Sequence, residues 1–139
     1  MNPKAVIFDA YGTLFDLRSA IPVCERIFPG HGAEFNALWR VKLLRHTRWC
    51  VITGRYRDLW QIADAAIGDA CRQMKLRCSS EEQAEIRQQY LELHMFPEVP
   101  DTLRVLRERF TLAVLSHGTS LMLRTVAEKN GSTANSPPF

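Results

Sequence analysis

Two short apolar segments constrain the fold of this chain more than any other feature. Lys4–Asp9 and Thr111–Ser116 are rich in aliphatic and β-branched residues, and each ends abruptly at a small polar loop. Short continuous apolar runs are typical of strands buried on both faces of a parallel sheet. The sequence therefore predicts an α/β fold in which the loops after these strands form the ligand-binding edge of a doubly wound sheet.

The residues between the two segments show helical periodicity instead. Apolar stripes run through Phe35, Leu38, Trp39 and Leu43, and through residues 59–74. Ser79 and Glu82 have the spacing of a capping box before a helix that carries Ile86, Tyr90 and Leu93. We expect two further helices, over Asp101–Arg109 and from Thr119 to a stop at Gly131. Leu44 and Leu59 are interpreted as core residues rather than pocket-lining ones.

This order of elements predicts a domain organisation. Residues 1–16 and 96–131 form a partial, incomplete α/β core, residues 17–95 form an inserted helical-bundle cap, and residues 132–139 form a disordered tail. Two strands alone do not make a stable parallel sheet, which usually has about five strands. The predicted core is therefore small for its fold class.

Composition narrows the function classes. The chain has 139 residues, and its 18 Lys and Arg against 15 Asp and Glu give a net charge of +3 with the basic residues scattered in sequence. We therefore expect no nucleic-acid partner and no membrane partner. The strand-like apolar runs are four residues long, far short of the ~20 residues that span a bilayer. The N-terminal segment lacks the pattern of a signal peptide, which favours a cytoplasmic location.

Cysteine and histidine are not spaced as metal ligands. The sequence has no C-x-x-C pair and no H-x-x-x-H pair among Cys24, Cys50, Cys71, Cys78, His31, His46, His94 and His117. We interpret the cysteines as reduced and mostly buried thiols. The sequence thus predicts no metal site built from Cys or His.

Asp9 is the strongest candidate for a catalytic residue. It lies at the carboxyl end of the first predicted strand, where loop N–H groups and the Thr13 hydroxyl surround it. A partly desolvated carboxylate in such a place is suited to act as a nucleophile that forms a covalent ester. Position alone leaves open the alternative that Asp9 only caps a turn.

The residues around Asp9 resemble a known motif. Phe8–Asp16, Phe-Asp-Ala-Tyr-Gly-Thr-Leu-Phe-Asp, resembles the first motif of the haloacid dehalogenase superfamily, and Tyr11 resembles specifically its 2-haloacid dehalogenase (type II) branch. Leu38–Lys42 resembles the arginine segment of that branch's helical cap, Pro97–Asp101 its return to the core, and Val114–Gly118 its second motif. The resemblance covers about residues 4–131.

The resemblance implies an activity and a set of site residues. Asp9 would displace halide from C2 of a short (S)-2-haloalkanoic acid, and water would hydrolyse the aspartyl ester to the 2-hydroxy acid without a cofactor. Arg40 would take the halide, Ser116 would hold the substrate carboxylate, and Thr13 would bind the Asp9 carboxylate or its ester. Tyr11 and His117 would contact substrate, with the role of His117 open because the family commonly has Asn there.

Tyr11 also separates two possible activities. Phosphatases of the superfamily carry an Asp at this position that protonates the leaving group, whereas halide leaves without a proton. A tyrosine, with an ordinary pKa of about 10, is poorly suited to that proton transfer near neutral pH. Tyr11 therefore favours carbon–halogen cleavage over the alternative of a superfamily phosphatase.

Part of the family pattern has no counterpart in this chain. No segment resembles the family's later lysine or its acidic strand end, and Lys129 is interpreted as a helix C-terminal cation. The resemblance therefore implies a C-terminally truncated chain whose activity is open. The alternative is a non-catalytic remnant that acts by binding a partner. Whether the chain forms a homodimer is left open by the sequence.

Overall fold

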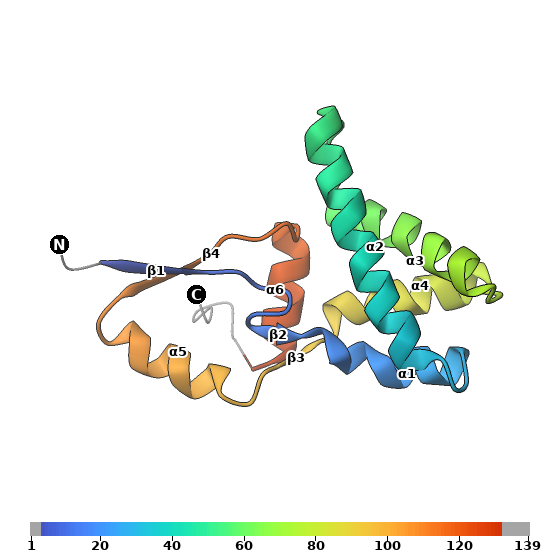
Figure 1. Ribbon diagram of the computed structural model, residues 1–139. Helices are drawn as coiled ribbons and strands as arrows, with labels where there is room; N and C mark the ends of the chain where they lie inside the picture. Colours follow the sequence, from blue (N-terminus) through green and yellow to red (C-terminus); the bar gives the residue numbers. More distant parts are fainter. Residues whose placement is uncertain (1–3, 132–139) are drawn as a thin grey trace. The chain divides into compact units, whose positions relative to one another are not determined.

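The computed structural model describes residues 4–131, so the predicted tail at residues 132–139 lies outside the described residues. These residues cluster into two compact units, residues 4–17 with 91–131 and residues 18–90. Figure 1 shows strands and helices in the first unit and a group of helices in the second. That residues 17–95 form a cap domain inserted into a core domain stays a prediction.

The first unit contains a parallel pair of strands. β1 (Ala5–Phe8) pairs with β4 (Thr111–Val114), with Ala5 opposite Thr111 and Phe8 opposite Val114. The predicted α/β fold and its parallel sheet are confirmed. A second, antiparallel pair joins β2 (Phe15–Asp16) to β3 (His94–Met95).

Burial of β1 differs from the expectation. The prediction of a strand buried on both faces is wrong, because Ala5 and Ile7 are exposed, Ile7 by 65%. Among the described residues β4 is the only strand that pairs with β1, so one edge of β1 lacks a neighbour. The apolar character of Ile7 therefore marks a surface that these residues do not cover.

In the described part of the first unit, two helices accompany the strands (Figure 1). α5 (Val99–Arg107) begins two residues earlier than expected, since Pro100 fits the first helical turn, where its missing N–H leaves no hydrogen bond unmade. α6 (Ser120–Lys129) agrees with the predicted helix, and Gly131 follows it at φ 86°. Asn130 anchors the end of α6: its side chain donates to the carbonyls of Leu93 and Val126, at 2.8 and 2.7 Å.

The second unit is built from helices. They are a 3-10 helix (Leu17–Ala20, whose first residue clusters with the first unit), α1 (Ile21–Ile27), α2 (Gly32–Thr53), α3 (Leu59–Met74) and α4 (Ser80–Gln88). A 3-10 turn over Gln89–Leu91 follows. α3 coincides with the predicted stripe, and Asp58 caps its first turn by accepting a hydrogen bond from Gln61 N at 2.8 Å.

The predicted start of α4 is confirmed and its end is not. Ser79 Oγ accepts from Glu82 N at 3.2 Å, and Glu82 Oε2 accepts from Ser79 N at 2.8 Å, which completes the capping box. The helix ends at Gln88, so Tyr90 lies in the 3-10 turn and Leu93 beyond it. Both are nevertheless buried, which explains why they mimic a helical stripe in the sequence.

The core of the second unit forms where α2 and α3 face each other. Buried side chains from both helices fill it, namely Phe35, Trp39, Leu43, Ile62, Ala63, Ala66, Ile67 and Ala70. Leu59 is buried as expected, whereas the expectation for Leu44 is wrong because it is 49% exposed. Leu44 lies one residue after the buried Leu43 and so faces another direction on the helix.

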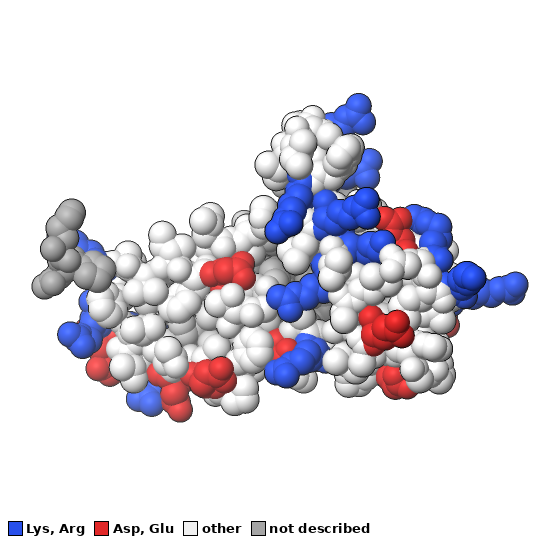
Figure 2. Space-filling view, viewed as in Figure 1, with Lys and Arg blue, Asp and Glu red and all other residues white. Residues whose placement is uncertain are grey.

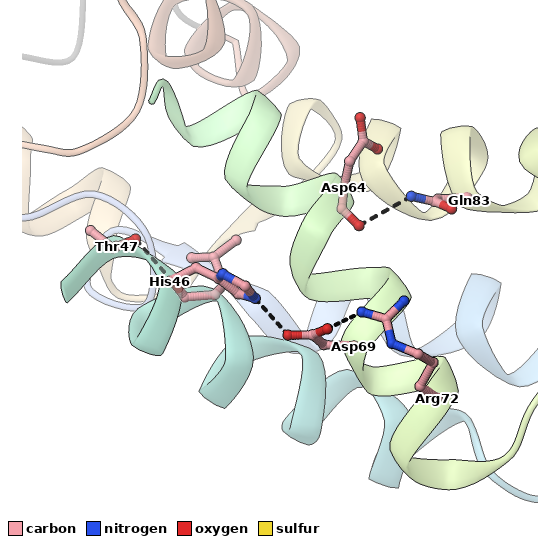
Figure 3. A network of polar contacts seen from close by, with 7 residues as sticks. His46, Thr47, Asp64, Asp69, Arg72 and Gln83 are labelled. Carbon is pink, nitrogen blue, oxygen red and sulfur yellow. Dashed lines mark hydrogen bonds and ion pairs between the residues drawn. The ribbon is translucent and has the colours of Figure 1, made fainter. Parts of the chain in front are cut away.

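A polar network also joins these helices (Figure 3). His46 on α2 contacts Asp69 on α3, with 2.7 Å between Nε2 and Oδ2, and Arg72 pairs with the other Asp69 oxygen. On the next pair of helices, Gln83 Nε2 donates to the Asp64 carbonyl at 3.1 Å. Polar contacts thus hold α3 to both of its neighbours.

Basic side chains gather on this unit although they are scattered in the sequence. Figure 2 shows Lys and Arg over the helices, and α2 carries Arg40, Lys42, Arg45 and Arg48. Among the residues described, no helix is long and apolar enough to cross a membrane. A cytoplasmic location stays a prediction from the sequence.

Candidate active site

The loops that follow β1 and β4 lie side by side. The strands are parallel neighbours, and Leu115 N donates to the Phe8 carbonyl at 2.9 Å just beyond β4. Asp9 and Ser116 therefore leave the sheet at the same edge. This is the edge at which parallel sheets bind ligands.

The first loop is folded tightly around one carbonyl. Ala10, fully buried, accepts hydrogen bonds from the N–H groups of Thr13, Leu14 and Phe15, at 3.3, 2.9 and 3.0 Å. Gly12 takes φ 94°, in the left-handed region that favours glycine, and its N–H donates to the Phe15 carbonyl at 2.8 Å. These contacts give the loop a defined backbone on which side chains can be positioned.

Thr13 orients the Asp9 carboxylate. Its Oγ1 donates to Asp9 Oδ2 at 3.0 Å, across four residues of the same turn. Both residues are exposed, so the expectation of a partly desolvated Asp9 is wrong for the residues described. The reason is the uncovered side of β1, since Ile7 is exposed as well.

The second loop leads into a helix N-terminus. Gly118 N donates to Ser116 Oγ at 3.1 Å, and Thr119 caps α6 by accepting from Met122 N at 3.2 Å. Ser116 is half-buried and His117 is exposed. A hydroxyl beside a helix N-terminus is suited to binding an anionic group such as a carboxylate.

Tyr11 brings the two loops into contact. Its ring lies 6.3 Å from the Phe15 ring, centroid to centroid, at an interplanar angle of 46°. On another side it meets Gly118, where a Cβ atom would come within 2.6 Å of Tyr11 Cε2. Gly118 was not expected as a site residue, although a glycine between Ser116 and a helix start was visible in the sequence.

Arg40 belongs to the second unit, on α2, and is exposed. The neighbouring Trp39 packs edge-on against Tyr90, with 4.9 Å between ring centroids. Burial raises the pKa of Tyr90, and the charge of Arg40 opposes part of that rise. The predicted role of Arg40 as the halide ligand stays a prediction.

Lys129 lies at the end of a helix, as predicted, and the cysteines differ in burial. Lys129 is the last residue of α6 and pairs with Glu92 at 2.8 Å, which confirms it as a helix C-terminal cation. Of the four cysteines, Cys24 and Cys71 are buried, while Cys50 and Cys78 are half-buried. Burial raises the pKa of Cys24 to about 12. Within residues 4–131, no three His, Cys, Asp or Glu side chains cluster in a way that could hold a metal ion.

Comparison with known proteins shows which family the chain resembles. A family model described as a hydrolase, haloacid dehalogenase-like hydrolase, matches residues 3–136. Haloacetate dehalogenase H-2 from Moraxella sp. (strain B) is 36% identical over 129 residues, which are 92% of this chain and 58% of that protein. (S)-2-haloacid dehalogenase from Pseudomonas sp. (strain YL) is 38% identical over 129 residues, 92% of this chain and 56% of that protein.

Solved structures show the same relationship. The L-2-haloacid dehalogenase from Xanthobacter autotrophicus matches with a TM-score of 0.87 at 33% identity, over 94% of this chain and 53% of that one. The same enzyme with chloropropionic acid covalently bound matches equally well, with a TM-score of 0.87 at 32% identity. The chain therefore spans somewhat more than half the length of the proteins it matches.

Proposed function

Because the chain belongs to the haloacid dehalogenase-like hydrolases, we propose that it supplies the nucleophile for the hydrolysis of short (S)-2-haloalkanoic acids to 2-hydroxy acids. The observation that carries the proposal is the meeting of two loops at one sheet edge, with Asp9 and Thr13 on one and Ser116 on the other. Relatives named as (S)-2-haloacid dehalogenases support the substrate class.

The first step is a displacement at carbon. An Asp9 carboxylate oxygen attacks C2 of the substrate, the carbon–halogen bond breaks, and halide leaves with the bonding electron pair. The Thr13 hydroxyl, 3.0 Å from Oδ2, holds the carboxylate in one orientation for this attack. Arg40 is proposed to receive the halide, because a guanidinium stays charged and offers several N–H donors.

The second step restores Asp9. Water adds to the Asp9 carboxyl carbon of the ester and the bond from that carbon to the ester oxygen breaks; one water proton goes to the departing oxygen and the other to solvent. The 2-hydroxy acid therefore leaves with the oxygen through which Asp9 attacked. Inversion at C2 occurs once, which gives a product of opposite configuration. Ser116 and His117, beside the start of α6, are proposed to hold the substrate carboxylate through both steps.

Halide release from (S)-2-chloropropionate tests the proposal in the chain as it stands. We expect release that falls at least about a thousandfold in Asp9→Asn, because the amide is a poor nucleophile. Asp101→Asn is the matched control, since Asp101 is an exposed carboxylate on α5 that pairs only with the nearby Arg104 among the contacts described. Equal rates in both variants, or no release from a folded parent chain, would contradict the proposal.

We propose further that two copies of the chain associate through the outward face of α2. Val41, Leu44 and Ile52 lie on this face, opposite the buried Trp39 and Leu43, and are 60, 49 and 77% exposed. A helix that is apolar on two opposite faces has one face without a packing partner inside the unit. An outward apolar face of this kind is suited to packing against another helix.

The charges on α2 favour a second copy as the partner. Glu34 and Arg48 lie seven residues, about two helical turns, before and after Val41. If two α2 helices pack antiparallel about a two-fold axis at Val41, each Glu34 lies opposite the Arg48 of the other copy. A two-fold interface contains every contact twice, so this pairing occurs at both ends.

A further inference from the structure

At Gly118 a side chain is excluded by lack of room and not by the backbone angles. Its φ is not in the left-handed region, where glycines 12, 30, 54 and 131 lie. An added Cβ would instead come within 2.6 Å of Tyr11 Cε2, 3.3 Å of the Tyr11 hydroxyl oxygen and 3.4 Å of Cζ. Real Cβ atoms do not approach other heavy atoms within 3.0 Å, so any side chain here displaces the Tyr11 ring.

The surroundings leave the ring as the part that must move. The backbone of the Tyr11 loop is fixed by three hydrogen bonds to the Ala10 carbonyl, and a backbone bridge joins Tyr11 to the buried Phe15. On the other side, the Gly118 N–H is bonded to Ser116 Oγ and the next residue caps α6. Two held backbones therefore face each other with an aromatic ring between them.

We propose that Gly118 is a positioning residue for Tyr11, and that this contact sets how large a substituent on C2 the site accepts. Tyr11 lies two residues after Asp9 in the loop that carries the nucleophile, and its ring meets Gly118 in the loop that carries Ser116. Because the ring lies between the two loops that carry the proposed nucleophile and carboxylate ligand, its position is proposed to limit the space for the substrate's alkyl group. The selectivity part of this inference rests on the proposed dehalogenation, whereas the contact between Gly118 and Tyr11 does not.

Fluorine spectra of chain labelled with 3-fluorotyrosine test the contact without any activity. The sequence has three tyrosines, at positions 11, 56 and 90, and Tyr11→Phe identifies the signal of Tyr11 by its loss. We expect Gly118→Ala to shift the Tyr11 signal and to leave the other two in place. An unchanged Tyr11 signal in the folded variant would overturn the proposal.

Thermal unfolding separates this contact from a general need for glycine. We expect Gly118→Ala to lower the Tm by about 3–10 °C in the parent chain, as overpacking does. The fall should be the same in a Tyr11→Phe background, which keeps Cε2, and nearly absent in Tyr11→Ala, which removes the ring. An equal fall in all three backgrounds would show that the ring is not what Gly118 accommodates.

Selectivity is read from the ratio of kcat/KM for 2-chlorobutanoate to kcat/KM for chloroacetate. We expect Gly118→Ala to change this ratio at least about fivefold, since one methylene in a pocket is discriminated by roughly tenfold or more. Gly68→Ala on α3 serves as the control that leaves the ratio unchanged. An equal loss of kcat/KM on both acids indicates that Gly118 has a structural role alone, and it overturns the proposed effect on selectivity. A parent chain that releases no halide overturns that effect too, but the fluorine spectra then still show whether Gly118 positions Tyr11.

Discussion

Glycines 32 and 68 in the helical unit differ in what a methyl group would meet. At Gly32, the first residue of α2, an added Cβ would collide with Glu25 N and Glu25 Cα, both backbone atoms of α1. At Gly68, inside α3, the nearest atom is Arg72 Nη1 at 3.5 Å, the end of a flexible side chain. Position 32 requires glycine because the backbones of α1 and α2 approach closely there, whereas position 68 has room for a methyl group.

We therefore expect alanine to have opposite effects at the two positions. Gly32→Ala should lower the free energy of unfolding by about 1–3 kcal/mol or more, because α1 and α2 must separate to make room. Gly68→Ala should raise it by roughly 0.5–1 kcal/mol, because alanine restricts the unfolded chain and favours the helix. Urea unfolding followed by circular dichroism measures both. A loss of stability in Gly68→Ala would contradict this account.

For single residues, the sequence predicts which side chains carry the chemistry better than it predicts which residues touch. Asp9 and Ser116 were expected near each other because parallel strands end at a common edge, which is a property of the fold class. The approach of Gly118 to Tyr11 depends on how two loops pack that lie 107 residues apart in the sequence, and the approach of Gly32 to Glu25 depends on how sharply the chain turns between α1 and α2. No local pattern encodes such a distance, so these glycines could not be distinguished from ordinary turn residues.

Among the elements, those with local signals were predicted most closely. α3 and the start of α4 depend on apolar spacing and on side-chain caps within a few residues, and both agree with the structure. The end of α4 depends on tertiary burial, since Tyr90 and Leu93 are buried outside the helix. The exposure of β1 depends on which neighbours cover it, and its composition alone gives no information on that.

The contact between α2 and α3 contains a charged link whose strength depends on pH. Burial by itself would raise the pKa of Asp69, but the hydrogen bonds from His46 and Arg72 outweigh it and lower that pKa below its usual value. A carboxyl group whose pKa is lower in the folded state stabilises the fold above its unfolded pKa. That stabilisation is lost as the pH falls through the folded value.

The expected outcome is a loss of stability in acid that depends on Asp69. The parent chain should be more stable than Asp69→Asn at pH 6, and the difference should shrink as the pH falls below about 4, the ordinary range of an Asp carboxyl. Urea unfolding across this range measures the difference. Asp101→Asn is the control for an exposed Asp, and a difference that is the same at pH 6 and pH 3 would contradict the assignment.

Viewed whole, the chain combines a helical unit with a well-filled core and an α/β unit with an uncovered strand. Ile7 and Leu115, at the two paired strands, are 65 and 75% exposed, and the chain spans 53–58% of the length of the relatives described above. The presence of two paired strands and a block of helices could be predicted from periodicity. The exposure of Ile7 and Leu115 could not, because an apolar side chain in a strand looks the same in the sequence whether or not a neighbour covers it.

Self-association through α2 is the prediction that belongs to this scale. We expect light scattering to show a dimer of the parent chain, and Val41→Glu to shift it to monomer, because a carboxylate would be buried at the two-fold axis. Glu34→Arg should weaken the dimer by placing two arginines opposite each other, and adding Arg48→Glu should restore it by exchanging the charges. Arg104→Glu on α5 is the matched charge change that should have no effect. If the charge-exchanged double variant is weaker than either single variant, α2 does not pair antiparallel about Val41, and if the parent is a monomer the proposed interface does not form.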